Sequence, residues 1–221
     1  MKKFKAFLFD CDGTVVDSDK LIIDSWANVV KILAPDIVFK AEDIIKHFGV
    51  PFAETVDLLA EQYNIPSSEY NIDVLYKAYW GYHASHRKDI AGTFPEEKET
   101  LIALKEAGAK LALVTSATTI IGSEELEISG ILDLFDVIIG CDLVERHKPY
   151  PDEAIKACKE LGIAPEDAIM IGDSKHDVAC GNKAGLSTGL VMWSSCRTSN
   201  LQGDEKPDYE IKAFSELLAF V

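Results

Sequence analysis

The segment FLFDCDGT, residues 7–14, decides the fold of this chain. Its apolar residues 7–9 are typical of a strand that is buried on both faces of a parallel sheet. Two carboxylates follow at Asp10 and Asp12, and Gly13 then indicates a turn. Burying carboxylates at the end of a strand is costly unless a partner balances them. The segment is therefore either an ordinary polar turn or a site where two acids meet a metal ion.

Composition and charge limit the kinds of protein that this chain can be. Its 221 residues suffice for one full core, or for a core with a smaller companion, and 48% of them are hydrophobic, as in a folded protein. The formal net charge of −15 disfavours nucleic-acid phosphates and anionic lipid, so we expect neither nucleic acid nor membrane as a partner. A phosphorylated small molecule would need positive charge gathered locally, from a metal ion, a lysine or backbone N–H groups.

The cysteines and the N-terminus indicate a cytoplasmic protein with reduced thiols. None of the five cysteines is spaced as CxxC and no His/Cys cluster accompanies them, so we expect no zinc site. The apolar stretch after Lys2 and Lys3 ends at Asp10, which is too short for a signal peptide, and no apolar run approaches the length of a membrane span. The cysteines are Cys11, Cys141, Cys158, Cys180 and Cys196.

From residue 110 onwards, short apolar runs alternate with helical patterns, and a further helical pattern precedes the first run. The helical patterns begin near acids or proline and end at glycine, and they cover residues 95–108, 151–162 and 174–185. Strands that alternate with helices pair in parallel through right-handed crossovers, so we expect a doubly wound α/β sheet. The apolar runs lie at residues 110–116, 135–142, 167–174 and 187–192.

Between the first strand and this alternation, the sequence has only helical patterns. We expect an all-helical domain at residues 17–89, inserted into a core domain formed by residues 1–16 and 90–221. Its many aromatic side chains favour packing between helices over a ligand cage. The helical patterns cover residues 19–33, 41–48, 52–63 and 67–88, separated by Pro35, by the segment 49–51 and by Pro66.

Polar residues stand where several apolar runs end. In open α/β sheets, ligands bind beyond the carboxyl ends of the strands. Asp10, Thr115 and Asp173 each come at the end of a run, and Lys148 follows the run 135–142 by a short loop. Each could be an ordinary cap, turn or surface residue. Together on one rim they would supply a nucleophile, a phosphate anchor, a cation and a metal ligand.

The order and spacing of four motifs resemble the haloacid dehalogenase-like (HAD) phosphatases. The resemblance covers nearly the whole chain and is greatest to the phosphoglycolate phosphatase and β-phosphoglucomutase-like branch, in which a helical cap lies between the first and second motifs. It implies a Rossmann-like α/β core and Mg²⁺-dependent phosphoryl transfer. The motifs are DCDGTVVDS (10–18), LALVTSA (111–117), HKPYPD (147–152) and IGDSKHD (171–177).

The resemblance implies a role for each acid of these motifs. Asp10 matches the nucleophile that takes the phosphoryl group as an aspartyl-phosphate, which divides one difficult hydrolysis into two steps. Asp12 matches the general acid/base that protonates the leaving oxygen and then activates water. Asp10, the backbone carbonyl of Asp12 and Asp173 match the Mg²⁺ ligands, and Mg²⁺ prefers such hard oxygen donors.

The resemblance also implies which residues hold the phosphate. Thr115 and Ser116 match the group that binds it with a hydroxyl and neighbouring N–H groups. Lys148 matches the lysine that neutralises the nucleophile and the incoming phosphate, because phosphoryl transfer needs mostly positioning and charge stabilisation. The supporting residues are Gly13, Ser174 and Asp177.

Departures from the family pattern bear on the reaction. The presence of Asp12 favours phosphoryl chemistry, since the resemblance implies that dehalogenases lack this second aspartate. Mutase-like members carry a histidine near the position of Ile22, and phosphosugar mutases tend to carry an arginine in the segment that corresponds to 49–55; this chain has neither. Hydrolysis is therefore favoured over a mutase. Lys46 and His47 are candidates for substrate contact from the cap.

The sequence thus predicts a Mg²⁺-dependent HAD-type phosphatase acting on a small phosphorylated metabolite, such as phosphoglycolate or a sugar phosphate. A phosphosugar mutase, a pyrophosphatase and a non-catalytic binding module on the same fold are the alternatives. We expect a monomer or a homodimer. Cys11, between the two aspartates, is expected to serve packing, and the segment 194–200 is expected to be a surface loop near the last strands.

Overall fold

The computed structural model describes residues 2–47, 50, 52–90, 92–195, 197 and 201–221. The chain divides into two compact units, a core unit formed by Met1–Asp17 with Gly92–Val221 and a helical unit formed by Ser18–Ala91. The sequence-based boundaries at residues 17 and 89 lie close to this division. Each unit is described by itself.

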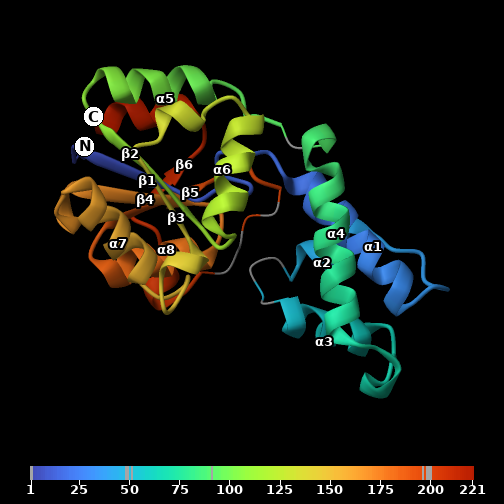
Figure 1. Cartoon of the computed structure of the whole chain (residues 1–221). Coiled ribbons are helices and arrows are strands. Elements are labelled where there is room, and N and C mark those ends of the chain that lie inside the picture. Colours follow the sequence, from blue (N-terminus) through green and yellow to red (C-terminus); the bar gives the residue numbers. More distant parts are fainter. Residues whose placement is uncertain (1, 48–49, 51, 91, 196, 198–200) are drawn as a thin grey trace. The chain divides into compact units, whose positions relative to one another are not determined.

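A parallel sheet forms the centre of the core unit (Figure 1). The described residues give it six strands in the order β3-β2-β1-β4-β5-β6, and all their pairings are parallel. This confirms the expected Rossmann-like α/β fold. The strands are β1 (Ala6–Phe9), β2 (Lys110–Thr115), β3 (Val137–Gly140), β4 (Ala168–Gly172), β5 (Ser187–Val191) and β6 (Tyr209–Ile211).

The central strand carries the segment with which the sequence analysis began. β1 pairs with β2 on one side and β4 on the other, so Phe9 lies opposite Leu113 and Ile171. Every residue of β1 and of β4 is buried, as expected for parallel strands covered on both faces. β6 was not predicted, because three residues at a sheet edge are too few for a periodic pattern.

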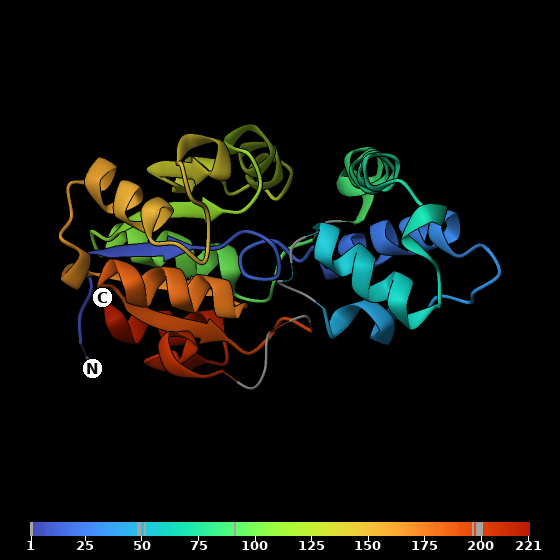
Figure 2. The ribbon, with the colours of Figure 1, turned by 90° about the horizontal axis from the view of Figure 1, so that it is seen from below.

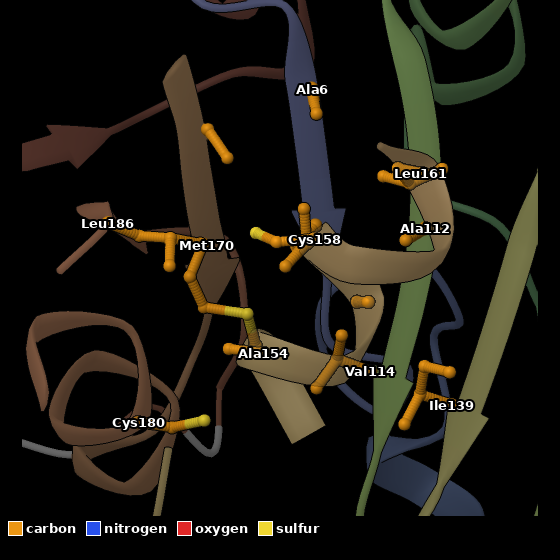
Figure 3. Packing of buried hydrophobic residues seen from close by; sticks show 13 residues of the cluster. Ala6, Ala112, Val114, Ile139, Ala154, Cys158, Leu161, Met170, Cys180 and Leu186 are labelled. Atoms are coloured by element: carbon orange, nitrogen blue, oxygen red, sulfur yellow. The ribbon is translucent and has the colours of Figure 1, made fainter. Parts of the chain in front are cut away.

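Helices cover both faces of this sheet. α7 (Asp152–Leu161) and α8 (Lys175–Ala184) pack on the face that presents Ala112 and Val114 (Figure 3). α6 (Thr119–Ile128) lies on the opposite face, where Leu113 points. Figure 1 shows α5 (Glu97–Glu106) and α7 on opposite sides of the strands. The fold is therefore doubly wound, as the alternating pattern predicted.

The helical unit contains four α-helices in its described residues. The predicted stretch 19–33 coincides with the first of them. Aromatic side chains of this unit pack against one another: the ring centroid of Trp26 lies 5.0 Å from that of Phe52 and 5.2 Å from that of Tyr79. Figure 2 shows this unit with its last helix viewed along the axis. The helices are α1 (Asp19–Leu33), α2 (Ala41–Ile45), α3 (Phe52–Gln62) and α4 (Ile72–Ile90).

Two backbone hydrogen bonds join the points where the chain leaves and re-enters the core unit. Asp17 and Gly92 exchange N–H···O bonds of 3.0 Å each. Among the described residues, no helix combines the length and apolar character that crossing a membrane requires. Cys196 lies outside the described residues; the described cysteines, all free thiols, are Cys11, Cys141, Cys158 and Cys180.

A buried carboxylate opens the first helix after this junction. Glu97 is 1% exposed, and its Oε2 accepts a 2.9 Å hydrogen bond from the backbone N–H of Phe94. Its Oε1 has no hydrogen-bond partner among the described residues. Burial raises the pKa of Glu97 to about 7, although the hydrogen bond from Phe94 acts in the opposite direction.

Replacing Glu97 by Gln should change how stability depends on pH. Because the pKa of Glu97 is higher in the folded chain, its protonated form favours folding, and that stability is lost as the pH rises through about 7. Between about pH 5 and about pH 8, wild type should therefore lose on the order of 2 kcal/mol relative to Glu97→Gln. Urea unfolding of both proteins at each pH measures this difference. A difference in unfolding free energy between wild type and Glu97→Gln that stays the same at every pH would contradict this prediction.

Candidate active site

Three acidic or hydroxyl side chains lie at the carboxyl ends of neighbouring strands. Asp10 follows β1, Thr115 ends β2 and Asp173 follows β4. The backbone N–H of Asp10 donates to the carbonyl of Ile171 at 2.8 Å, which continues the β1–β4 ladder by one residue. All three side chains belong to buried residues. The parallel sheet thus brings them to one edge, where ligands bind in such folds.

Lys148 reaches this edge from the loop that precedes α7. Its Nζ donates to Asp10 Oδ1 at 2.6 Å, to Asp177 Oδ1 at 2.6 Å and to the carbonyl of Val114 at 3.0 Å. Burial by itself would lower the pKa of Lys148, but Asp10 and Asp177 raise it well above its ordinary value, so the ammonium stays charged. No other lysine or arginine in the described part of the chain is buried.

The buried carboxylates outnumber this lysine. Asp10, Asp173 and Asp177 each offer an oxygen, and these oxygens lie within 4.8 Å of one another. Burial and the charge of Asp177 raise the pKa of Asp10, while Lys148 acts in the opposite direction. Like charges at this distance repel strongly in a buried site. The cluster therefore favours a divalent cation.

The donor set fits a hard cation. Asp10 and Asp173 supply carboxylate oxygens, which Mg²⁺ and similar ions prefer. Gly13, with φ of +72°, lies against one of them: a Cβ at this position would stand 2.6 Å from Asp173 Oδ2. Only glycine leaves room for that carboxylate while adopting this backbone conformation.

The carboxylate of Asp177 accepts hydrogen bonds from Ser174 and Lys148 and so holds both residues in place. It forms the capping box of α8, in which its Oδ2 accepts from the backbone N–H of Ser174 at 3.0 Å and from the Ser174 hydroxyl at 2.6 Å. Its Oδ1 accepts from Lys148, so both carboxylate oxygens are engaged. A Cβ at Gly172 would come within 2.3 Å of the Asp177 side chain. Asp177 thus orients Lys148 from the start of α8.

Asp12 and Cys11 lie in the turn that follows β1. The carboxylate of Asp12 lies within 4.8 Å of Cys11 Sγ and of a carboxylate oxygen of Glu125, which comes from α6. Cys11 donates to Glu125 Oε2 at 3.2 Å and is fully buried. Burial, with the nearby charge of Glu125, raises the pKa of the Cys11 thiol well above its ordinary value. This protonated, buried thiol fits the expected packing role.

The residues expected to bind phosphate differ in exposure. The Thr115 hydroxyl is buried and accepts from the backbone N–H of Ala117 at 3.1 Å, while its own proton can be donated to a ligand. Ser116 is exposed. Their contact with phosphate stays a prediction.

The cap residues singled out in the sequence belong to the helical unit. Lys46 donates to Gln62 within that unit, and His47 is half-buried, with Phe48, Gly49 and Pro51 outside the described residues. Burial, with the charge of Lys46, lowers the pKa of His47. Substrate contact by Lys46 and His47 stays a prediction.

The sequence analysis missed Glu153. This residue of α7 is fully buried, and its Oε2 accepts the backbone N–H of Lys148 at 3.1 Å. Its Oε1 has no hydrogen-bond partner among the described residues. Burial raises the pKa of Glu153, against the effect of Lys148. Glu153 thereby fixes the backbone from which the Lys148 side chain extends.

The surface-loop expectation for 194–200 is wrong at Ser194. This side chain is fully buried, and its hydroxyl donates to Asp173 Oδ2 at 2.8 Å, whereas Ser195 and Arg197 are exposed. The chain turns inward directly after Trp193, whose Nε1–H donates to the carbonyl of Thr14 at 3.2 Å.

Comparison with known families agrees with this arrangement. The model of the haloacid dehalogenase-like hydrolases matches residues 7–191 of the chain. The chain belongs to this family. It is therefore a hydrolase of this family, and relatives that cover nearly the whole chain are named phosphatases or pyrophosphatases. Hydrolases of this family generally use a divalent metal.

Individual relatives cover nearly the whole chain. Pyrophosphatase PpaX from Bacillus velezensis is 32% identical over 217 residues, which are 98% of this chain and 96% of that protein. The crystal structure of a "predicted phosphoglycolate phosphatase" from Haemophilus somnus has a TM-score of 0.84 at 25% identity and covers 99% and 98% of the two chains. A HAD family hydrolase from Deinococcus radiodurans, solved with bound phosphate and sodium, has a TM-score of 0.79 at 24% identity and covers 99% and 95%.

Two substitutions at Glu153 distinguish the effect of losing its hydrogen-bond acceptor from the effect of losing its negative charge. Glu153→Ala leaves the buried N–H of Lys148 without a partner, and we expect it to lower the free energy of unfolding by about 2 to 3 kcal/mol. Glu153→Gln keeps an acceptor oxygen and should cost less than about 1 kcal/mol. The neighbouring Asp152, ion-paired with Arg146, provides the control, because an exposed pair contributes little.

Urea unfolding of Glu153→Ala, Glu153→Gln and Asp152→Ala measures these differences. If Glu153→Ala and Glu153→Gln lower the free energy of unfolding equally, the acceptor oxygen does not account for the stabilising effect of Glu153.

Proposed function

We propose that this chain is a Mg²⁺-dependent phosphatase that hydrolyses a small phosphorylated metabolite through an aspartyl-phosphate on Asp10. One observation supports the proposal above all. The buried carboxylates of Asp10, Asp173 and Asp177 have oxygens within 4.8 Å of one another at the carboxyl edge of the sheet, and Lys148 donates a hydrogen bond to Asp10 there. That cluster combines a nucleophile, a cation and candidate metal ligands. A protein that only bound a ligand would not require Asp12 beside the nucleophile.

The first half of the reaction transfers the phosphoryl group to the chain. A carboxylate oxygen of Asp10 attacks phosphorus while the bond to the leaving oxygen breaks, and Asp12 donates a proton to that oxygen. Lys148 holds the Asp10 carboxylate in place through its 2.6 Å hydrogen bond and offsets the charge of the incoming phosphate. Thr115 provides a hydroxyl donor for the phosphoryl oxygens.

The second half returns the chain to its starting state. Asp12 now accepts a proton from a water molecule, whose oxygen attacks phosphorus and releases inorganic phosphate from Asp10. Asp10, the Asp12 carbonyl and Asp173 would hold Mg²⁺, which supplies positive charge to the phosphoryl oxygens when it is bound. Asp177 keeps Lys148 directed at the nucleophile throughout.

Pyrophosphate is a second candidate substrate. It is favoured by the 32% identity to pyrophosphatase PpaX over 98% of this chain. Hydrolysis of pyrophosphate and of a phosphate monoester both break a P–O bond, so the same residues could serve either reaction. In this proposal the helical unit is the cap that selects the substrate, with Lys46 and His47 as candidate contacts, and the enzyme is cytoplasmic.

Phosphate release from a panel of compounds tests the proposal. The panel comprises phosphoglycolate, several sugar phosphates and pyrophosphate, each with Mg²⁺ and with EDTA. Wild type should release phosphate only with Mg²⁺, and Asp10→Asn should lower the rate by roughly 10³-fold or more because the nucleophile is lost. Asp167→Asn, which alters an exposed aspartate paired with Lys5, is the matched control and should keep the wild-type rate.

The relative rates decide between phosphate monoesters and pyrophosphate. Undiminished release by Asp10→Asn would contradict the assignment of the nucleophile, and release in EDTA would contradict the metal requirement.

A further inference from the structure

The hydroxyl of Ser194 contacts Asp173, one of the proposed metal ligands, although Ser194 was expected to lie in a surface loop. Ser194 lies after β5, and it is fully buried. Its Oγ–H donates to Asp173 Oδ2 at 2.8 Å. Asp173 itself follows β4, so the hydrogen bond joins the chain segments that leave two neighbouring strands.

A third chain segment also lies against the Oδ2 atom of Asp173. Gly13, in the turn after β1, lies so close that a Cβ there would stand 2.6 Å from Asp173 Oδ2 and 2.9 Å from Ser194 Oγ. The turn after β1, the residue after β4 and the segment after β5 therefore meet at one carboxylate oxygen. Little space is left for the Asp173 carboxylate to rotate.

Packing of the preceding residue holds Ser194 in place. The Trp193 ring stacks on Phe214 with 4.5 Å between ring centroids and lies 5.9 Å from the ring of Phe94. Its Nε1–H donates to the carbonyl of Thr14 at 3.2 Å. Ser194 thus directly follows a residue whose ring packs against two other aromatic rings of the core unit, and these contacts help to place the Ser194 hydroxyl beside Asp173.

The affinity of a carboxylate for a metal ion depends on the hydrogen bonds that its oxygens accept from neighbouring groups. A hydrogen bond to one oxygen fixes the plane of the carboxylate and restricts the direction in which the other oxygen points. Outer hydrogen bonds of this kind typically change metal affinity by about 10- to 100-fold. The serine hydroxyl is neutral, so it orients the ligand without competing with a cation for its charge.

We propose that Ser194 is a positioning residue that holds the Asp173 carboxylate ready for the divalent cation. This inference rests on the proposed function, in which Asp173 is a metal ligand. It assigns part of the metal affinity of the chain to the segment after β5, outside the four motifs. A merely structural role for Ser194 would instead affect the stability of the fold and leave the metal affinity unchanged.

Metal titration of the full chain tests this role. The probe is Mn²⁺, followed by electron paramagnetic resonance and competed with Mg²⁺, on wild type, Ser194→Ala and Asp173→Asn. We expect the dissociation constant to rise about 10-fold in Ser194→Ala, and binding to be lost in Asp173→Asn. Excess Mg²⁺ should restore the turnover of Ser194→Ala, because the ligand itself is intact.

Two further variants make the comparison specific. Ser25 is a second fully buried serine, bonded to the carbonyl of Leu21 at 2.7 Å in the helical unit, and Ser25→Ala should bind the metal as wild type does. Ser194→Gly removes the same hydroxyl, so failure of one Ser194 variant to fold does not decide the outcome. Thermal unfolding in EDTA identifies the variants that are folded.

The outcomes distinguish this inference from the proposed function. Unchanged affinity in the folded Ser194 variants, together with loss of binding in Asp173→Asn, would overturn the role of Ser194 and leave the proposed metal site intact. Absence of Mn²⁺ binding in wild type, or unchanged binding in Asp173→Asn, would overturn the metal site and the role of Ser194 together.

Discussion

The ion pairs of Lys148 with Asp10 and Asp177 are the interaction on which the rest of the site depends. They connect the end of the central strand, the loop before α7 and the start of α8, three segments that are far apart in the sequence. Removing one partner of such a buried pair typically costs about 3 to 5 kcal/mol, because the other charge is left uncompensated. The charges proposed for catalysis are therefore also needed by the folded core.

Several other features serve to place these charges. Glu153 fixes the backbone of Lys148, and the capping box of α8 fixes the carboxylate of Asp177. Gly13 and Gly172 leave the space that the side chains of Asp173 and Asp177 fill. Each is a local arrangement with an ordinary structural explanation, a cap or a close approach. Together they leave one lysine facing several buried carboxylates, a charge balance that a bound divalent cation would complete.

The sequence predicts those parts of the molecule that depend on short-range patterns. The apolar runs identified five strands of the sheet, and the helical pattern at 19–33 coincides with α1, because a buried strand and an amphipathic helix both impose a periodicity. Asp10 and Asp173 were predicted as site residues because polar residues at strand ends meet at one edge of a parallel sheet, and Lys148 because a short loop could bring it to the same edge. The structure brings these three side chains together.

Other features have no local signal. β6 is too short for a pattern. Glu153 looks like an ordinary acid in the first turn of a helix, and only the fold shows that it accepts the N–H of Lys148. Ser194 was expected in a surface loop, whereas it is fully buried next to Trp193, whose ring stacks on the distant Phe214. These contacts depend on where distant segments meet, which periodicity does not encode.

The central claim is that Asp10 carries the phosphoryl group, and trapping the intermediate tests it most directly. Wild type is mixed with p-nitrophenyl phosphate and Mg²⁺, quenched in acid and reduced with borohydride, which converts an aspartyl-phosphate to homoserine. Peptide mass spectrometry then locates the change. The account predicts homoserine at position 10. Phosphate release without any change at Asp10, or with the change at another aspartate, would contradict it.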